Sequence, residues 1–316
     1  MIQNEFARWV LKNASQLNLN VQEASWTKDW LSGYSNMQVT IEVADQKIIG
    51  HGFASSKELA FLKAAGEAIE RAICLENNLR STGVATYPSI EGAQLRASNE
   101  LKERDVFLCH YLTGVPFQRQ LEVSGFEPAQ EKLKVEGIKI SALQMVTPIN
   151  EYGVVCFATP IDRKPHCFSS IIGLGYDHQF KSALEKAYLE CLQASIHFIY
   201  KGKDKNIEVN NLTNPKDHKD LFLTSKHFDV IQHLINNVKD DFCFPKKISV
   251  DFEELRFQNP IFTKIPLHFV KATSNGAQIM FYGETTVEKM NLTRLEDFKR
   301  EPVDISSINF IPHCVG

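Results

Sequence analysis

The 316-residue sequence lacks the cysteine patterns that mark zinc sites and disulfide frameworks. Its seven cysteines are scattered, and no C-x-x-C pair occurs. Because both kinds of site need closely patterned cysteines, we expect neither, and we expect reduced thiols. The sequence also lacks an apolar run long enough to span a bilayer, and Glu5 and Arg8 interrupt the N-terminus before a signal-peptide core can form. These absences favour a cytoplasmic protein without a membrane partner.

An excess of charge of one sign is missing as well. The 35 lysines and arginines nearly balance the 38 acids, and the formal net charge is −3. A protein with this balance has no general attraction for polyphosphate, so nucleic acid is disfavoured as a partner. The P-loop pattern G-x-x-x-x-G-K-[ST] is absent too, so a phosphate site would have to be built in another way. A hydrophobic fraction of 43% is typical of a globular protein.

One pattern occurs three times along the chain. Each copy places a glutamate seven residues after an alanine in a segment of helical composition, in the pairs Ala60–Glu67, Ala93–Glu100 and Ala183–Glu190. The first two copies continue to a second glutamate and an arginine, namely Glu70–Arg71 and Glu103–Arg104. In the third copy Gln193 and Ala194 take these places. Internal repetition of this kind can define a fold.

The periodicity of the apolar residues predicts an α+β fold. We expect helices at residues 2–16, 57–78, 91–112 and 180–200, and strands at 37–44, 46–53, 134–149, 152–161, 247–255, 266–274 and 277–283. Residues 201–220 are expected to form an exposed loop, and the proline-containing ending, 291–316, is expected to be extended. We expect an N-terminal helical segment, 1–34, followed by one domain, 35–316, whose mixed or antiparallel sheets are covered by the repeated helices.

The repeated acids suggest a metal-bound nucleotide. Glutamates at positions i and i+3 lie on adjacent turns of a helix, so two such helices offer four carboxylates: Glu67, Glu70, Glu100 and Glu103. Oxygen ligands of this kind suit Mg²⁺ shared with phosphate, and Arg71 and Arg104 would serve the phosphate oxygens. A single E-x-x-E-R is usually only a solvated, ion-paired face, and its repetition favours the binding role. A di-iron site would need E-x-x-H, which these segments lack.

At these residues the chain resembles the YcaO family of ATP-using enzymes. The match lies in GHG…A…GEAIER (50–71), STGVA…EGA…NELKERD (81–105) and GLG…SALEKAYLECLQ (173–193), and the resemblance covers residues 35–316. It implies a YcaO-like fold and ATP bound through Mg²⁺ on the four glutamates. It implies catalytic roles for Glu67, Glu100 and Arg104 and cofactor contacts for Glu70, Arg71 and Glu103. Further candidates for ATP contact are Glu190, Lys271 and Arg294, although a surface salt bridge is an equal alternative for the last two.

The resemblance also implies an activity and partners. A YcaO enzyme activates a peptide-backbone amide by O-phosphorylation, which gives an azoline by cyclodehydration or a thioamide by thioamidation of a ribosomally synthesised peptide. We therefore expect a precursor peptide, a leader-binding or accessory protein, and a homodimer. His51, Thr82 and Gly92 depart from the family pattern, and Gly92 stands where an acid is common. The alternative hypothesis is a non-catalytic subunit that binds the precursor or a partner enzyme. His110 is expected to be a buried structural histidine.

Overall fold

The computed structural model describes residues 2–162, 168–201, 212–240 and 243–315. The chain forms two compact units. Unit 1 consists of Met1–Leu101 and Val250–Ser274, and unit 2 of Lys102–Ser249 and Asn275–Gly316. Both units combine helices with antiparallel strands, which confirms the expected α+β class. The boundary between Leu101 and Lys102 lies within helix α3 (Ile90–Thr113), so this helix contributes to both units.

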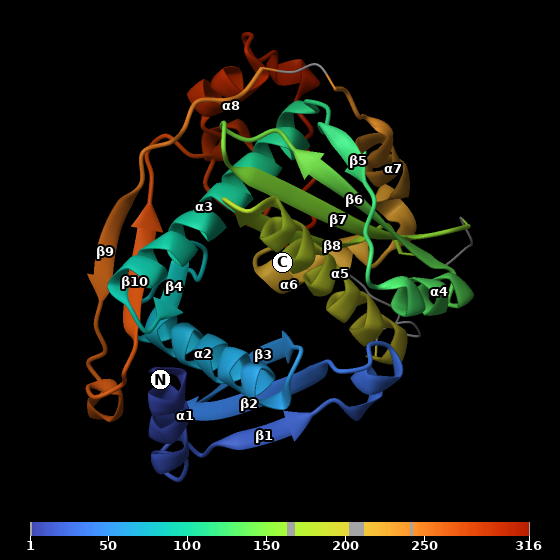
Figure 1. The fold of residues 1–316 in the computed structure, drawn as a ribbon. Coiled ribbons are helices and arrows are strands. Elements are labelled where there is room, and N and C mark those ends of the chain that lie inside the picture. Colours follow the sequence, from blue (N-terminus) through green and yellow to red (C-terminus); the bar gives the residue numbers. More distant parts are fainter. Residues whose placement is uncertain (1, 163–167, 202–211, 241–242, 316) are drawn as a thin grey trace. The chain divides into compact units, whose positions relative to one another are not determined.

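In unit 1, a three-stranded antiparallel sheet supports helix α2 (Lys57–Glu76) (Figure 1). Its strands are β1 (Asn20–Glu23), β2 (Ser35–Val43) and β3 (Gln46–Ala54), in that order. The expected hairpin is confirmed, with Val43 opposite Gln46 and a turn of two residues at positive φ, Ala44 and Asp45. From Met37 to Val43, buried residues of β2 alternate with partly exposed ones. Helix α1 (Ile2–Lys12) and the short helix η1 (Ser25–Asp29) complete this part of the unit.

Two glycines let α2 lie directly on β3. A Cβ atom on Gly50 would stand 2.1 Å from the carbonyl oxygen of Ala64, and one on Gly52 would stand 1.9 Å from that of Ala60. Any side chain at these positions would therefore push the helix away from the sheet. The N-terminus of α2 is capped by Ser56, whose side chain accepts a hydrogen bond from the Leu59 N–H.

The second sheet of unit 1 joins distant parts of the chain. Its strands are β4 (Val84–Tyr87), β10 (His268–Thr273) and β9 (Asp251–Leu255), with β10 in the middle. Small residues on the first half of α3 pack against β4 and β10 in a compact cluster: Ala85, Ala93, Ala97, Leu101, Val270 and Ala272. The short helix η3 (Pro260–Phe262) lies between β9 and β10 in sequence.

Unit 2 is built on a four-stranded antiparallel sheet. Its strands, in order, are β5 (Arg119–Leu121), β6 (Ile138–Met145), β7 (Tyr152–Pro160) and β8 (Ile171–Asp177). Helix α5 (Phe180–Lys201) packs on β7 and β8. The remaining helices of the unit are α4 (Glu127–Val135), α6 (Pro215–Phe222), η2 (Ser225–His227), α7 (Phe228–Asn236), η4 (Val287–Lys289), α8 (Leu292–Lys299) and η5 (Ile305–Ser307).

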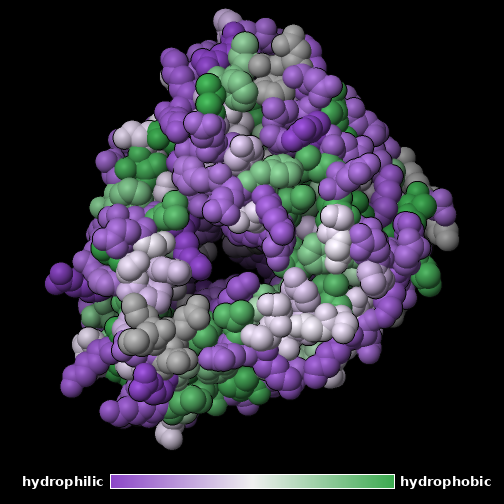
Figure 2. Space-filling model, viewed as in Figure 1, coloured by the Kyte–Doolittle hydropathy of each residue, from purple (hydrophilic) through white to green (hydrophobic). Residues whose placement is uncertain are grey.

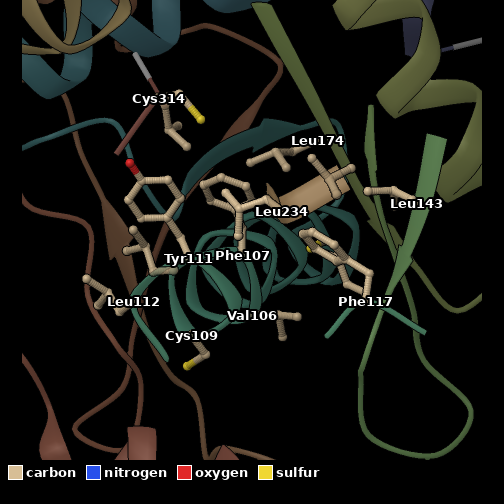
Figure 3. Packing of buried hydrophobic residues seen from close by; sticks show 14 of the residues in the cluster. Val106, Phe107, Cys109, Tyr111, Leu112, Phe117, Leu143, Leu174, Leu234 and Cys314 are labelled. Atoms are coloured by element: carbon tan, nitrogen blue, oxygen red, sulfur yellow. The ribbon is translucent and has the colours of Figure 1, made fainter. Parts of the chain in front are cut away.

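The second half of α3 runs through the core of unit 2 (Figure 3). Its rings Phe107 and Tyr111 stack with their centroids 5.9 Å apart. The Tyr111 hydroxyl donates to the Pro312 carbonyl, which ties the end of the chain to this core. Burial of these large side chains stabilises the position of α3 in the unit.

Three expectations for the second half of the chain were wrong. Within the expected loop 201–220, of which 202–211 lie outside the described residues, Asn214 and Asp217 form a capping box that starts α6. Residues 277–283 are not a strand, because the Gln278 N–H donates to the Asp105 carboxylate instead of to a neighbouring strand. The ending contains α8 and η5, since Pro302 lies beyond the last residue of α8 and does not interrupt it.

One face of the molecule, drawn in Figure 2, is mainly hydrophilic. On the face drawn in Figure 2, hydrophobic residues are scattered among hydrophilic ones. Over the described part of the chain, no helix combines the length and the hydropathy that crossing a membrane would require.

Candidate functional site

The expected acids of the first repeat lie on α2 in unit 1. Glu67 accepts a hydrogen bond from the backbone N–H of His51 at 2.5 Å, and its other oxygen pairs with Arg71 at 2.7 Å. Arg71 in turn donates to the carbonyl oxygen of Ile49 at 2.6 Å. Both side chains remain partly exposed, at 32% for Glu67 and 47% for Arg71. They are therefore held in place and still accessible to a ligand.

Three carboxylates of unit 1 influence one another. Burial is the main cause that raises the pKa of Glu70 well above its ordinary value, and the negative charges of Glu100 and Glu67 add to it. Burial also raises the pKa of Glu67, against the effect of Arg71. Glu100 accepts a hydrogen bond from the Gly83 N–H at 3.3 Å. A cation among these carboxylates would relieve their repulsion.

Lys271, on β10, supports the loop beside Glu100. Its ammonium group donates to the carbonyl oxygens of Thr82 and, at 3.4 Å, Arg80. Burial lowers the pKa of Lys271, and the charge of Glu100 opposes that shift. The contacts of this lysine therefore position the loop whose Gly83 N–H reaches Glu100. A contact of Lys271 with nucleotide remains a prediction.

The acids of unit 2 form a second group with two cations. Glu103 is fully buried, and one of its oxygens accepts a hydrogen bond from Lys186 at 2.7 Å. The other oxygen receives no hydrogen bond from the described residues, and Arg104 approaches it only to 3.7 Å. Glu190 accepts a hydrogen bond from the Leu174 N–H at 3.2 Å. Burial raises the pKa of Glu190, while Arg104 opposes this and Glu103 adds to it.

Lys186 was missed by the sequence analysis. It lies on α5, one turn before Glu190, and its side chain is half exposed. The signal that could have identified it is its place in the third repeat, since Lys63 stands one turn before Glu67 in the first. A lysine at this position would be read as an ordinary i,i+4 partner of Glu190, whereas the tertiary structure directs it to Glu103.

The same local structure carries the first and third repeats. As on β3, two glycines on β8 are pressed against a helix: a Cβ atom on Gly175 would stand 2.0 Å from the Ala183 carbonyl oxygen, and one on Gly173 would stand 2.2 Å from that of Ala187. In both units the residue between the glycines donates its N–H to the repeat glutamate. The repeat is thus a strand and helix in close contact, with the glutamate bound to the strand.

Arg294 is buried in a different environment. It is 4% exposed, and its guanidinium binds Asp105 at 2.6 Å and Asp297 at 3.2 Å. These contacts join α8 to α3 within unit 2. Asp105 is therefore a partner that the sequence analysis did not identify, and the proposed contact of Arg294 with ATP remains a prediction.

Gly92 has no room for a side chain. A Cβ atom there would stand 2.0 Å from Cδ1 of Tyr87, whose ring carries the Arg96 guanidinium 4.5 Å from its centroid. The tyrosine ring thus fills the space that an acid at this position would need. Position 92 therefore contributes no acid to the metal site expected from the sequence.

His110 is structural, as expected. It is fully buried, its Nδ1–H donates to the Val115 carbonyl at 2.8 Å, and its Nε2 accepts the Val146 N–H at 2.9 Å. Burial lowers its pKa to about 4. Both nitrogens are used by the fold, so this histidine is not a catalytic base.

The donor set fits magnesium, although the ligands are not gathered in advance. Within the described ranges, no three His, Cys, Asp or Glu side chains already form a metal-binding group. The acids are nevertheless oxygen donors, and Glu103 has a buried oxygen without a hydrogen bond. Mg²⁺ keeps several waters and is commonly shared between a few carboxylates and substrate phosphates. The residues present are therefore compatible with Mg²⁺ brought in with a nucleotide.

Residues 77–256 match the family model described as YcaO cyclodehydratase, ATP- and Mg²⁺-binding. The chain belongs to the YcaO family. ATP and Mg²⁺ are the cofactors of that family. The matched residues include Glu100, Glu103, Arg104 and Glu190, whereas Glu67 precedes them. A comparison with curated proteins returned no match.

Solved structures confirm the YcaO fold. YcaO from Methanopyrus kandleri bound with AMPPCP and Mg²⁺ is 12% identical, with a TM-score of 0.61 over 87% of this chain and 91% of that one. A heterocyclase in complex with substrate and cofactor is 13% identical, with a TM-score of 0.68 over 97% of this chain and 57% of that one. The E. coli microcin synthetase McbBCD complex is 10% identical, with a TM-score of 0.57 over 93% and 96%. At these identities the likeness concerns the fold alone.

Proposed function

We propose that this YcaO protein is an ATP- and Mg²⁺-dependent enzyme that activates a backbone amide of a ribosomally synthesised peptide by O-phosphorylation. The observation that carries the proposal is the set of buried and partly buried acids within a chain of this family. Glu70 lies beside Glu67 and Glu100, and one oxygen of Glu103 receives no hydrogen bond from any residue that the structure describes. Such carboxylates are costly in the folded protein unless a cation binds them.

The proposed magnesium ligands are Glu67, Glu70 and Glu100 in unit 1 and Glu103 in unit 2. When bound, ATP and Mg²⁺ supply the γ-phosphoryl group and the charge that neutralises it. Arg71 in unit 1, and Arg104 and Lys186 in unit 2, would hold phosphate oxygens; Arg104 and Lys186 lie beside Glu103. Glu190 orients this group through its place next to both cations.

The chemistry requires no nucleophile from the protein. A nucleophile adds to the carbonyl carbon of the amide, and the carbonyl oxygen takes the γ-phosphoryl group and later leaves as phosphate. A Cys, Ser or Thr side chain of the peptide gives an azoline, whereas sulfide gives a thioamide. The protein's contribution is positioning and charge neutralisation, which dominate phosphoryl transfer. We assign these two roles, positioning and charge neutralisation, to Glu67, Glu100 and Arg104.

A precursor peptide and an accessory protein are the proposed partners, with a homodimer in the cytoplasm as the working form. The heterocyclase structure contains a substrate, and the microcin synthetase is a multi-protein complex. Both support the expectation of a peptide and an accessory protein for a chain of this fold.

Two measurements test the proposal. Calorimetry with Mg-AMPPCP should give a binding signal, and the protein co-expressed with a precursor encoded nearby should change the mass of that peptide. Loss of one water per site identifies cyclodehydration, and exchange of oxygen for sulfur identifies thioamidation. An unmodified peptide together with no nucleotide binding would overturn the proposal.

A second candidate is a non-catalytic YcaO subunit that binds the precursor or a partner enzyme. The Tyr87 ring against Gly92 favours it, since this contact removes one acid position from the site. Such a subunit should bind peptide or partner without hydrolysing ATP. Binding of Mg-AMPPCP together with phosphate release from Mg-ATP would exclude it.

A further inference from the structure

Strand β3 is an edge strand, and side chains instead of another strand bind the backbone groups of its outer edge, called the free edge below. Among the described strands, β3 pairs with β2 alone. Alternate residues direct their backbone groups away from β2, and side chains of α2 bind three of these groups. The contacts are Phe53 C=O with Lys63 at 3.1 Å, His51 N–H with Glu67 at 2.5 Å and Ile49 C=O with Arg71 at 2.6 Å.

The two spacings agree. Lys63, Glu67 and Arg71 are four residues apart on one helix face, which is about 6 Å along the axis. Residues 49, 51 and 53 are two apart on the strand, which is about 6.7 Å. The helix thus presents two donors and one acceptor to the edge at which a neighbouring strand would present its backbone groups. These side chains take the place of a missing strand.

This cover is particular to unit 1. On α5 the corresponding positions are Lys186, Glu190 and Ala194, but Lys186 binds Glu103 and alanine has no donor. Only Glu190 binds its strand, at the Leu174 N–H. The complete cover of β3 is therefore not a requirement of the strand and helix repeat.

We propose that the free edge of β3 is a docking strand for an extended peptide backbone, uncovered when Mg-ATP engages Glu67 and Arg71. The inference rests on the proposed function, which assigns these two residues to the metal and the phosphates. Backbone groups of an exposed edge are a ready template for an added strand. Since Gly50 and Gly52 hold α2 against β3, the helix stays in place and only the partly exposed side chains move.

The position of the edge argues for a peptide as its occupant. His51 is one hydrogen bond from Glu67, a proposed metal ligand. A peptide paired with this edge has its backbone amides beside the group that binds the nucleotide, where amide phosphorylation needs them. Peptide and nucleotide then bind cooperatively, because both need the Glu67 and Arg71 contacts with β3 to break. The nucleotide frees the backbone groups that the peptide binds, and the peptide frees the two side chains that the nucleotide binds.

His51 allows a sharp test, since its N–H points away from β2. Proline there removes the central donor of the edge, between those of Ile49 and Phe53, and leaves the β2–β3 ladder intact. His51→Ala keeps that donor and serves as the matched control. The probe is a fluorescein-labelled octapeptide of alternating threonine and valine, followed by anisotropy with and without Mg-AMPPCP. For the wild type and His51→Ala, Mg-AMPPCP should tighten peptide binding at least about fivefold. His51→Pro should lose this gain.

A double variant tests the edge without nucleotide. Glu67→Ala with Arg71→Ala uncovers His51 and Ile49 permanently, so it should bind the octapeptide in the absence of Mg-AMPPCP, and an octapeptide N-methylated at every amide should not bind. Equal peptide affinity of His51→Pro and His51→Ala, or no binding by the double variant, would overturn the inference. Absence of Mg-AMPPCP binding to the wild type would instead count against the proposed function, and the double variant would still decide the role of the edge.

Discussion

The backbone N–H of His51 donates to the carboxylate of Glu67, sixteen residues further along the chain. Leu174 and Glu190 form the same contact at the same separation in the other unit. In each case the donor lies between two glycines that hold the strand against its helix. The glutamates that define the sequence repeat are therefore oriented by the strand edge, before any ligand binds.

Removing a proposed metal ligand should stop turnover without unfolding the protein. Glu67→Gln and Glu100→Gln each keep the side-chain size and should lower the rate of ATP hydrolysis by about 100-fold or more, because the metal loses a charged ligand. Phosphate release measures the rate, and circular dichroism checks the fold. Glu58→Gln, an exposed change on α2, the helix that carries Glu67, is the control. Unchanged turnover in both variants would contradict the assignment.

Lys186 should contribute to nucleotide binding through its charge. Lys186→Met leaves the buried Glu103 without its closest cation and removes a phosphate contact, so the affinity for Mg-AMPPCP should fall about tenfold. Lys186→Arg should recover most of that affinity. Calorimetry measures both, with the exposed Lys181→Met on the same helix as control. An affinity that is insensitive to the charge at position 186 would argue for a packing role.

The strand glycines should be sensitive to a single methyl group. Gly50→Ala or Gly52→Ala places a Cβ atom against a carbonyl oxygen of α2 and should lower the free energy of unfolding by at least about 1–3 kcal/mol. Gly66→Ala is the matched control, because its Cβ would meet only the Thr86 hydroxyl at 3.8 Å within a helix. It should stabilise by roughly 0.5–1 kcal/mol. Urea denaturation followed by circular dichroism distinguishes these outcomes.

Arg294 should matter for stability. Arg294→Met leaves Asp105 buried without its ion pair, which should cost about 3–5 kcal/mol of unfolding free energy. The exposed pair Lys216–Asp220 offers the control, and Lys216→Ala should leave stability nearly unchanged. Denaturant titration measures both variants. A fully stable Arg294→Met protein would show that this pair does not hold α8 in place.

Acid should destabilise the protein through His110. Its pKa is lowered in the folded state from 6.5 to about 4, so the unfolded chain binds a proton that the folded chain refuses. The contribution of His110 to the free energy of unfolding has its full value above pH 6.5. It falls as the pH decreases toward 4, by roughly 3 kcal/mol in total. His110→Gln should be less stable at neutral pH and should reduce this slope. The buried His313, with its pKa lowered to about 3, leaves part of the slope in place.

Local patterns predicted the elements whose contacts are local. The hairpin of β2 and β3 and the helices α2, α3 and α5 were expected within a few residues of their observed ends. Their signals are alternation, helical spacing and capping, which act over a few residues. The strand predicted at 277–283 was wrong for the opposite reason. The Gln278 N–H donates to Asp105, which lies on α3, far away in sequence. No local pattern contains that partner.

The sequence alone determined that glutamates recur at a constant spacing with small residues around them, and this was enough to identify the family. The tertiary structure decided what each charged group binds. Lys63 and Lys186 occupy equivalent positions, yet one binds the edge of β3 and the other binds Glu103. Arg294 binds Asp105, far away in sequence. Spacing along a helix determines which side chains share a face, but the strands and helices packed against that face determine the partner.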